Sequence, residues 1–355
     1  MRRAAQFYLP ARSLRVLLVK RDKLGDLLLT TPVIARLAEA LPHAEIHLLA
    51  NDYNAWVARD HPALARTWTY QRVRSGGRVR PLAALRYLPI VLALRRLRFD
   101  AALVMGGDES PRAIRRAIGV RAARVVAYAA DPSRYGAALT DALPVPVAGH
   151  EVERMLALLG PLGIAPGTAS HPRYDLPRSG AAFARDWLRA RALEPGNFVL
   201  IGLGARRAKK QPDAAQVLRW SERLWRGHGL ATVLTWTPGR SNQPGYPGDD
   251  AIANPVIARG LPFLHAMRGT IGQSIAMAFH ARTSILPDSG LMHFAAASPG
   301  GVLGLFADPV DSAPAERWSP RGARVAWLEA GRRVTDLGDA EVFTALAPLL
   351  VPPAP

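Results

Sequence analysis

A short apolar strand that turns sharply into a helix occurs twice in the chain, near its start and again past its middle. The first copy runs from the apolar residues 15–19 through a glycine turn into a helix expected over 26–41. The second begins with the apolar run 198–203 and turns at Gly204. Such units build parallel sheets, whose ligands sit at the carboxyl ends of the strands. The pattern predicts an α/β protein with two doubly wound, Rossmann-like domains that face each other across a cleft.

The segment 163–179 marks the boundary between these domains, because it is rich in Pro, Gly and Ser and has no periodicity. Before it, strands are expected at 45–50 and 101–105, with a helix at 53–59. We therefore expect an N-terminal domain over 1–170, a C-terminal domain over 171–335 and a final helix within 336–355.

Composition excludes several classes of protein. The 355 residues include no cysteine, so a disulfide framework, a thiolate metal site and a thiol nucleophile are excluded, and a reducing compartment is expected. The first ten residues lack the apolar core of a secretory signal, and no uncharged apolar run approaches the length that spans a bilayer. These features favour a cytoplasmic globular protein.

Positive charge is concentrated in the first half of the chain. The formal net charge is +18, and residues 1–170 carry 25 Lys and Arg against 13 Asp and Glu. Between Gln71 and Phe99 there is no acidic residue, but there are eight arginines: 72, 74, 78, 80, 86, 95, 96 and 98. The apolar residues among them would make an amphipathic helix, kinked near Pro89. Such a field attracts nucleic acid, an acidic membrane face or an anionic substrate, unless it is simply a solvated basic face.

The turn of the first strand–helix unit lies within the stretch from Lys20 to Pro32. Gly25 allows close approach of the backbone, and Asp26 is expected at the start of the helix, facing the carboxyl edge of the sheet. A carboxylate there is suited to accept a proton, but an aspartate at this position is equally typical of a helix cap.

A second motif, Asp288-Ser289-Gly290, follows a strand and opens a helix. The backbone N–H groups and the dipole of that first turn form an anion site suited to a diphosphate. Asp288 is otherwise a capping residue, and His293 on the following helix is either near the ligand or packed in the core.

A third motif, Gly204 to Pro212, places four cations on a glycine loop beside a strand end: Arg206, Arg207, Lys209 and Lys210. These cations would neutralise phosphates, or they form a solvated basic loop. The loop after Trp236, which includes Asn242, has room to hold a ribose or base.

Taken in order, the three motifs resemble glycosyltransferase family 9, the ADP-heptose:lipopolysaccharide heptosyltransferases. The resemblance runs over roughly residues 14–350. It implies a GT-B fold with the acceptor domain first, the nucleotide-sugar domain second, and the C-terminal helix packing back on the N-terminal domain.

The resemblance also implies roles for single residues. Asp26 would be the general base on the acceptor hydroxyl, and Lys209 would stabilise the departing diphosphate. Single-step displacement implies inversion at the anomeric carbon, and enzymes of this kind need no catalytic metal or cofactor. The residues expected to bind the donor and its phosphates are Gly204, Arg206, Asn242, Asp288, Ser289, Gly290 and His293.

The implied acceptor is an anionic glycolipid, lipid A carrying Kdo, at the cytoplasmic face of the inner membrane, with which the enzyme would associate peripherally. The arginines between 72 and 98 would hold its carboxylates and phosphates and dock the enzyme at the acidic surface. No nucleic acid partner is expected, because aromatic residues are not interleaved with these arginines. The residues expected to contact the acceptor are Arg12, Lys20, Arg21, Lys23 and Gly25.

Two positions depart from the family pattern. Gln211 stands where the family usually has Trp before the motif proline, and Asn242 stands where it usually has a glutamate near the nucleotide. These departures leave open another nucleotide sugar or a non-lipopolysaccharide acceptor. A third alternative is a non-catalytic basic scaffold built on a degenerate transferase fold.

Overall fold

The computed structural model describes residues 13–72, 74–75, 78–79, 82–168, 170–243, 247–310 and 314–352. The chain divides into two compact units, Met1–Ser170 and His171–Pro355. This division falls inside the Pro-, Gly- and Ser-rich segment 163–179. Each unit is described by itself below.

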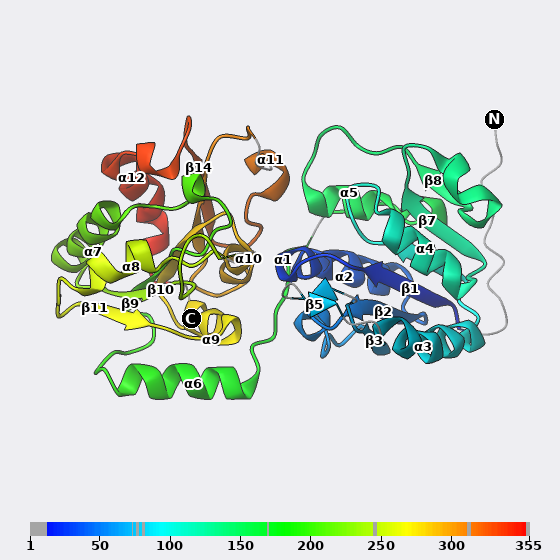
Figure 1. Cartoon of the computed structure of the whole chain (residues 1–355), viewed down its shortest axis with the longest axis horizontal. Helices are drawn as coiled ribbons and strands as arrows, with labels where there is room; N and C mark the ends of the chain where they lie inside the picture. The colour runs from blue at the N-terminus through cyan, green and yellow to red at the C-terminus, as the bar shows by residue number, and fades with distance from the viewer. Residues whose placement is uncertain are drawn as a thin grey trace. The chain divides into compact units, whose positions relative to one another are not determined.

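The first unit contains a six-stranded parallel sheet in the order β3-β2-β1-β6-β7-β8 (Figure 1). Its strands are β1 (Arg15–Lys20), β2 (Glu45–Asn51), β3 (Arg66–Tyr70), β6 (Ala101–Val104), β7 (Arg124–Tyr128) and β8 (Asp141–Leu143). Its helices are α1 (Leu24–Leu28), α2 (Thr31–Ala40), α3 (Ala83–Leu97), α4 (Pro111–Val120) and α5 (Glu151–Ala157), with 3₁₀ turns η1 (Ala55–Val57), η2 (Pro132–Ala138) and η3 (Gly160–Leu162). A short antiparallel hairpin joins β4 (Arg74–Ser75) to β5 (Arg78–Val79).

Helices α3 and α4 share one core with the sheet of the first unit. Leu94 of α3 and Ile114 of α4 are fully buried in the cluster that includes Leu17 of β1. Central strands such as β1 are apolar along nearly their whole length because helices cover both faces of a parallel sheet.

The second unit repeats the same arrangement, with the strand order β11-β10-β9-β12-β13-β14 (Figure 1). Its strands are β9 (Phe198–Gly202), β10 (Ala231–Thr235), β11 (Leu264–Met267), β12 (Thr283–Pro287), β13 (Val302–Phe306) and β14 (Val325–Glu329). Its helices are α6 (Arg178–Arg189), α7 (Ala214–His228), α8 (Asp250–Ile257), α9 (Ile271–Ala278), α10 (Gly290–Ala296), α11 (Ala315–Trp318) and α12 (Asp339–Leu350), with 3₁₀ turns η4 (Ala208–Lys210) and η5 (Val334–Asp336).

The C-terminal helix α12 packs on the second unit, while its predicted packing on the N-terminal domain stays a prediction. Its apolar face is buried in the core of the second unit, where Val342 and Leu346 are fully covered together with Trp220 of α7. Asp339, in the first turn of α12, accepts a hydrogen bond of 2.9 Å from the Trp220 indole. It also forms an ion pair of 2.6 Å with Arg219. The helix therefore belongs structurally to the second unit.

Two helices expected from the sequence are shorter in the structure. The helix predicted over 26–41 is divided into α1 and α2, and Pro32 lies in the first turn of α2, where a missing N–H costs nothing. The helix predicted over 53–59 is only the 3₁₀ turn η1.

Candidate functional site

In both sheets the strand order reverses at one point, between β1 and β6 in the first unit and between β9 and β12 in the second. At such a point the loops at the carboxyl ends of the two strands diverge and leave a crevice for ligands. The three predicted motifs leave the sheets at these positions, after β1, β9 and β12.

Asp26 is the third residue of α1, one turn after the end of β1. Its Oδ2 accepts a hydrogen bond of 2.8 Å from the backbone N–H of Lys23, which precedes the helix. The capping role that the sequence allowed is therefore present, and it fixes the carboxylate at the carboxyl edge of the sheet. Gly25 is buried within the same turn. The half-buried carboxylate is chemically able to accept a proton from a hydroxyl.

Lys20, expected to contact an acceptor, is 0% exposed at the end of β1. Its Nζ lies 3.4 Å from Asp22 Oδ2 and 3.7 Å from Met155 Sδ. Burial by itself would lower the pKa of Lys20, but nearby carboxylates outweigh it and the pKa is raised. These carboxylates are Asp22, Asp26 and Glu151. Lys20 is thus a buried counter-charge in this structure, and its predicted contact with an acceptor stays a prediction.

The other cations predicted to contact an acceptor differ from Lys20. Arg21 is half-buried and Lys23 is exposed, so both reach the surface beside Asp26. Arg12 lies outside the described residues.

Residues at the end of β2 hold the loop that carries Arg21 and Asp22. The side-chain amide of Asn51 donates to the Arg21 carbonyl at 2.5 Å, and that of Asn54 donates to the Asp22 carbonyl at 3.0 Å. Sequence analysis did not identify these two asparagines, although both follow a predicted strand. They fix the backbone from which the half-buried Arg21 and Asp22 side chains extend.

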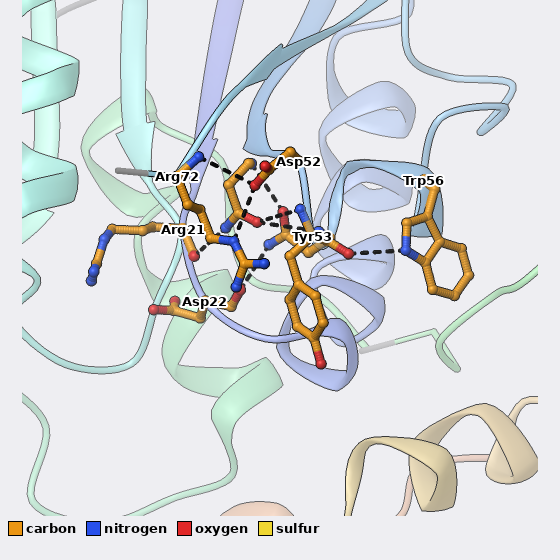
Figure 2. Close-up of polar contacts among 8 residues, drawn as sticks. Arg21, Asp22, Asp52, Tyr53, Trp56 and Arg72 are labelled. Atoms are coloured by element: carbon orange, nitrogen blue, oxygen red, sulfur yellow. Dashed lines mark hydrogen bonds and ion pairs between the residues drawn. The ribbon is translucent and has the colours of Figure 1, made fainter. Parts of the chain in front are cut away.

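Arg72 and Tyr53 lie at the same carboxyl edge of the first sheet, after β3 and β2. Arg72 donates from its backbone N–H and its Nε to Asp52 Oδ1 at 3.2 and 3.0 Å. Its guanidinium carbon lies 4.6 Å from the centre of the Tyr53 ring. Figure 2 shows these three side chains gathered beside Arg21 and Asp22.

On the other side of the strand-order reversal, the loop after β6 is closed by α5. Glu151 Oε1 accepts a hydrogen bond of 2.8 Å from the backbone N–H of Gly107. A Cβ on Gly107 would lie 2.5 Å from Glu151 Oε2 and 2.7 Å from Arg154 Cδ, so only glycine fits. Arg154 is 3.7 Å from Asp108. The sequence did not identify Glu151 and Arg154 as site residues, because they lie on α5, far along the chain from the strand ends that they contact.

The buried phenol of Tyr128 closes this cluster from β7. Its hydroxyl donates to the Arg154 carbonyl at 2.6 Å. Burial raises the pKa of Tyr128 to about 12, so the group stays neutral at physiological pH. It acts as a hydrogen-bond donor that fixes α5.

In the second unit, the loop after β9 brings two of the predicted motifs together. Lys210 forms an ion pair with Asp288 at the end of β12. Lys209 points to the loop after β13 instead, where its Nζ pairs with Asp308 and donates to the Val310 carbonyl. Both lysines are part-buried and each faces one carboxylate. An anion placed here would meet two adjacent cations on one loop.

The turn after β12 leads directly into α10, as predicted. Ser289 occupies the position before the helix in extended conformation, and Gly290 is the first helical residue. The Asp288 side chain forms an ion pair with Lys210 on the loop after β9. This pair takes the place of the helix-capping role that the sequence also allowed for Asp288. His293 is only 5% exposed on α10, in keeping with the packed-residue alternative.

Gln211, one of the two departures from the family pattern, has a structural role. Its Nε2 donates to the Leu203 carbonyl at 2.9 Å and to Asp249 Oδ1 at 2.6 Å. Asp249 also accepts from the Thr237 N–H at 2.8 Å, and burial raises the pKa of the Asp249 carboxyl. Gln211 therefore ties the loop after β9 to the loop after β10.

Asn242, the second departure, is exposed on the loop after β10 and lines a depression of about 590 Å³ with Asp250 and Asn254. Asp250 holds this loop by accepting hydrogen bonds of 2.9 Å from the Trp236 indole and the Gly239 N–H. Asn242 thus lies on the β10 side of the strand-order reversal. Gly204 is half-buried and Arg206 is exposed on the loop after β9.

Metal ligands and membrane-spanning helices are two features that bear on the predicted chemistry of the described residues. Among them, no three His, Cys, Asp or Glu side chains gather into a group that could hold a metal ion. None of the described helices combines the length and apolarity needed to cross a membrane.

Known protein families and solved structures share this architecture. The family model described as glycosyltransferase family 9 (heptosyltransferase) matches residues 89–329, more than half of the chain. This span includes Lys209 and Asp288 but begins after the Asp26 motif. No curated protein sequence matches the chain.

Solved structures share the fold over nearly the whole chain. A family 9 glycosyltransferase from Veillonella parvula DSM 2008 superimposes with a TM-score of 0.79 at 16% identity, covering 97% of this chain and 99% of that one. The E. coli heptosyltransferase WaaC with ADP gives 0.71 at 18% identity, covering 95% and 100%. E. coli ADP-heptose lps heptosyltransferase II gives 0.70 at 16%, covering 95% and 99%.

These matches confirm the predicted α/β GT-B fold class with two Rossmann-like sheets. They also confirm the predicted family and the coarse activity, glycosyl transfer. The chain belongs to glycosyltransferase family 9, the heptosyltransferase family.

Proposed function

We propose that the chain is an inverting glycosyltransferase that transfers heptose from ADP-heptose to the inner core of lipopolysaccharide. The observation that carries the proposal is the cation-rich loop after β9, which is joined by an ion pair to the turn that opens α10. Both elements lie at the strand-order reversal of the second sheet, where a nucleotide diphosphate is expected to bind.

The donor end would use charge and backbone dipoles. Lys209 and Lys210 would exchange their present carboxylate partners, Asp308 and Asp288, for diphosphate oxygens. The N–H groups of Ser289 and Gly290 at the start of α10 would add fixed dipoles. The related WaaC structures contain ADP and ADP-2-deoxy-2-fluoro heptose, which supports an ADP-linked donor.

The acceptor end would use Asp26. Its Oδ2 is engaged by Lys23, so we assign Oδ1 as the atom that takes the proton from the attacking hydroxyl. The hydroxyl oxygen forms a bond to the anomeric carbon as the bond to ADP breaks, and this single displacement inverts the anomeric configuration. Lys209 would stabilise the charge on ADP, so the proposed step uses neither a metal ion nor a cofactor.

The acceptor we propose is the anionic glycolipid Kdo–lipid A or its heptosylated core. Arg21 and Lys23 are the described cations nearest to Asp26 along the chain that reach the surface, and they would contact its carboxylates. The excess of positive charge in residues 1–170 would keep the enzyme at the cytoplasmic face of the inner membrane as a peripheral protein.

A different nucleotide sugar is the second candidate. Asn242 lines the depression after β10 without the negative charge that the family pattern has there, and Gln211 is occupied by Leu203 and Asp249. A change of base or sugar would fit these two positions.

Ligand-induced thermal stabilisation separates the two candidates. ADP, ADP-heptose, UDP and GDP are each added at one common concentration, about 100 times the dissociation constant of ADP, at which ADP stabilises by about 2.7 kcal/mol. We expect stabilisation by ADP and ADP-heptose alone. Selective stabilisation by UDP or GDP would overturn the ADP-heptose assignment.

The reaction itself is followed with a deacylated, water-soluble Kdo acceptor. Nuclear magnetic resonance of the product is expected to show an anomeric configuration opposite to that of the donor, and the rate is expected to persist in excess chelator. Retained configuration would contradict single displacement. Loss of activity in chelator that returns with added divalent ions would contradict the metal-free step.

A further inference from the structure

Helix α3 carries apolar side chains on two opposite faces. On the inner face, Leu94 is fully buried in the core that includes the sheet of the first unit, and Val91 is 9% exposed. Tyr87 adds to this contact through an edge-to-face pair with Tyr70 of β3, with ring centres 5.6 Å apart. The inner face therefore accounts for the attachment of the helix to its sheet.

The outer face of α3 is an exposed row of leucines. Leu82 immediately precedes the helix, and Leu85, Leu88 and Leu92 follow at helical spacing. They are 58%, 67%, 56% and 43% exposed, respectively. A helix that is apolar on both faces is normally covered on both, so the leucine row marks a contact surface.

Arginines border the leucine row on both sides. With about 3.6 residues per turn, Arg86 and Arg95 lie roughly a quarter turn to either side of Leu85, and Arg96 lies among the leucines. The Arg86 guanidinium donates to the Gln71 side-chain oxygen at 3.1 Å, and that of Arg95 donates to the Gly119 carbonyl at 2.8 Å. Both acceptors are neutral, so these contacts leave the positive charges uncompensated.

The sequence around the helix strengthens this charge pattern. Residues 71–99 contain eight arginines and no acidic residue. An apolar stripe flanked by Arg86 and Arg95, whose described hydrogen-bond partners are neutral, is complementary to a surface with anionic head groups above a hydrocarbon layer. A protein partner would have to match a continuous leucine row and a purely positive border at once.

We propose that α3 is the membrane-contact element of this enzyme, with its leucine row inserted at the boundary between head groups and acyl chains of an anionic bilayer. Arg86, Arg95 and Arg96 would contact lipid phosphates at the same depth. The inference rests on the proposed function only for its physiological meaning, since a glycolipid acceptor lies in such a surface. The contact itself is independent of catalysis.

Vesicle binding tests the proposal directly. The full chain is sedimented with vesicles of phosphatidylcholine and phosphatidylglycerol in equal parts, and with phosphatidylcholine alone. We expect binding to the anionic vesicles and little to the neutral ones. Leu85→Asn and Leu88→Asn are each expected to weaken binding roughly tenfold, which corresponds to losing about half of a fully buried leucine. Ile271→Asn, at an apolar residue 42% exposed on the second unit, is the matched control and should bind normally.

Insertion is read out with a fluorophore sensitive to polarity. The chain has no cysteine, so Leu85→Cys labels a single position, and Val147→Cys, at a fully exposed residue of the same unit, is the control. We expect a blue shift on anionic vesicles at position 85 and none at position 147. Equal responses at both positions, or unchanged binding by the asparagine variants, would overturn the proposal.

Two further readouts keep this proposal separate from the proposed function. Thermal stabilisation by ADP and transfer to the deacylated acceptor should be the same in the asparagine variants as in the wild type. If the wild type is dimeric by light scattering and the variants are monomeric, the leucine row is an interface between copies of the chain and the membrane proposal fails.

Discussion

In the first sheet, β1 ends in a buried lysine whose charge is balanced by three surrounding carboxylates, whereas in the second sheet the loop after β9 sets two part-buried lysines against one aspartate each. The strand orders of the two sheets correspond position by position. Their backbones therefore offer the same crevice, and the side chains at the strand ends decide which charge a ligand meets.

This difference matches the chemical role that the proposed function gives to each unit. The first edge holds the half-buried Asp26, the proposed proton acceptor, near the buried Lys20. At the second edge, Lys209 and Lys210 can change partners from aspartate to phosphate without burying a new charge. Under the proposed function, one fold would supply base chemistry at one edge and anion binding at the other.

The largest effect is expected from removing the proton acceptor. Asp26→Asn keeps a group that can accept from the Lys23 N–H but cannot take up a proton, so kcat should fall by about 10³-fold. Stabilisation by ADP should be unchanged, because the donor is assigned to the second unit. Asp60→Asn, at an exposed aspartate of the same unit, is the control and should retain full activity. An active Asp26→Asn enzyme would leave the first edge without its assigned role.

The next largest effect is expected from the buried lysine. Lys20→Met leaves Asp22 and its neighbouring carboxylates without their buried counter-charge. Because Asp22 is 38% exposed and stays partly solvated, we expect a loss of about 1–3 kcal/mol, less than for a fully buried pair. Urea unfolding of the full chain should show this loss. Lys23→Met is the control, at the exposed residue that directly follows Asp22. It should change the free energy of unfolding by less than about 0.5 kcal/mol. Equal stability of both variants would show that Lys20 is not the electrostatic centre of this edge.

Sequence reasoning located the loops better than it judged their side chains. The apolar runs that became β1, β9 and β12 were recognised, and this alone placed Asp26, Lys209 and Asp288 at strand ends. The half-exposed β3, with its alternating polar residues, was missed because it lacks a continuous apolar run. A strand at the edge of a sheet gives a weaker signal than a central one.

Contacts between distant segments could not be predicted at all. Lys20 meets Met155, which is 135 residues away, and Glu151 reaches Gly107 across 44 residues. Nothing in the local pattern around Lys20 distinguishes a buried lysine from one that faces a ligand. The sequence of α12 has the same limit: its apolar spacing predicts that the helix packs but not on which surface.

A smaller effect is expected from the two lysines of the second edge, and it separates them. Lys209→Ala should lower kcat by roughly 10²-fold if it stabilises the departing diphosphate. Lys210→Ala should mainly weaken ADP binding, by roughly tenfold, because it exposes the unpaired Asp288 carboxylate to the phosphates. Combining Lys210→Ala with Asp288→Asn should restore part of this affinity. Strictly additive losses in a titration of ADP would contradict the assigned pairing.

The smallest effect concerns pH and the interior of the first sheet. Burial lowers the pKa of His47 in β2 from its ordinary value of 6.5, and the Trp68 indole donates to His47 Nδ1 at 3.0 Å, which requires an unprotonated nitrogen. The native state therefore holds this imidazole neutral, whereas the unfolded chain takes up a proton below about pH 6.5. The free energy of unfolding should fall as the pH drops below 6.5, until the native pKa is reached.

His47→Gln should remove this dependence while costing about 1 kcal/mol near pH 8, since glutamine can retain only part of the contact with Trp68. The measurement is urea unfolding between pH 8 and 5, followed by tryptophan fluorescence. His265 of β11, whose pKa is also lowered by burial, provides the counterpart in the second sheet. His265→Gln should leave the contribution of His47 in place, so the two variants together assign the pH dependence to each sheet. If the single variants and the wild type all lose stability equally on acidification, the dependence arises from carboxylates and not from these imidazoles.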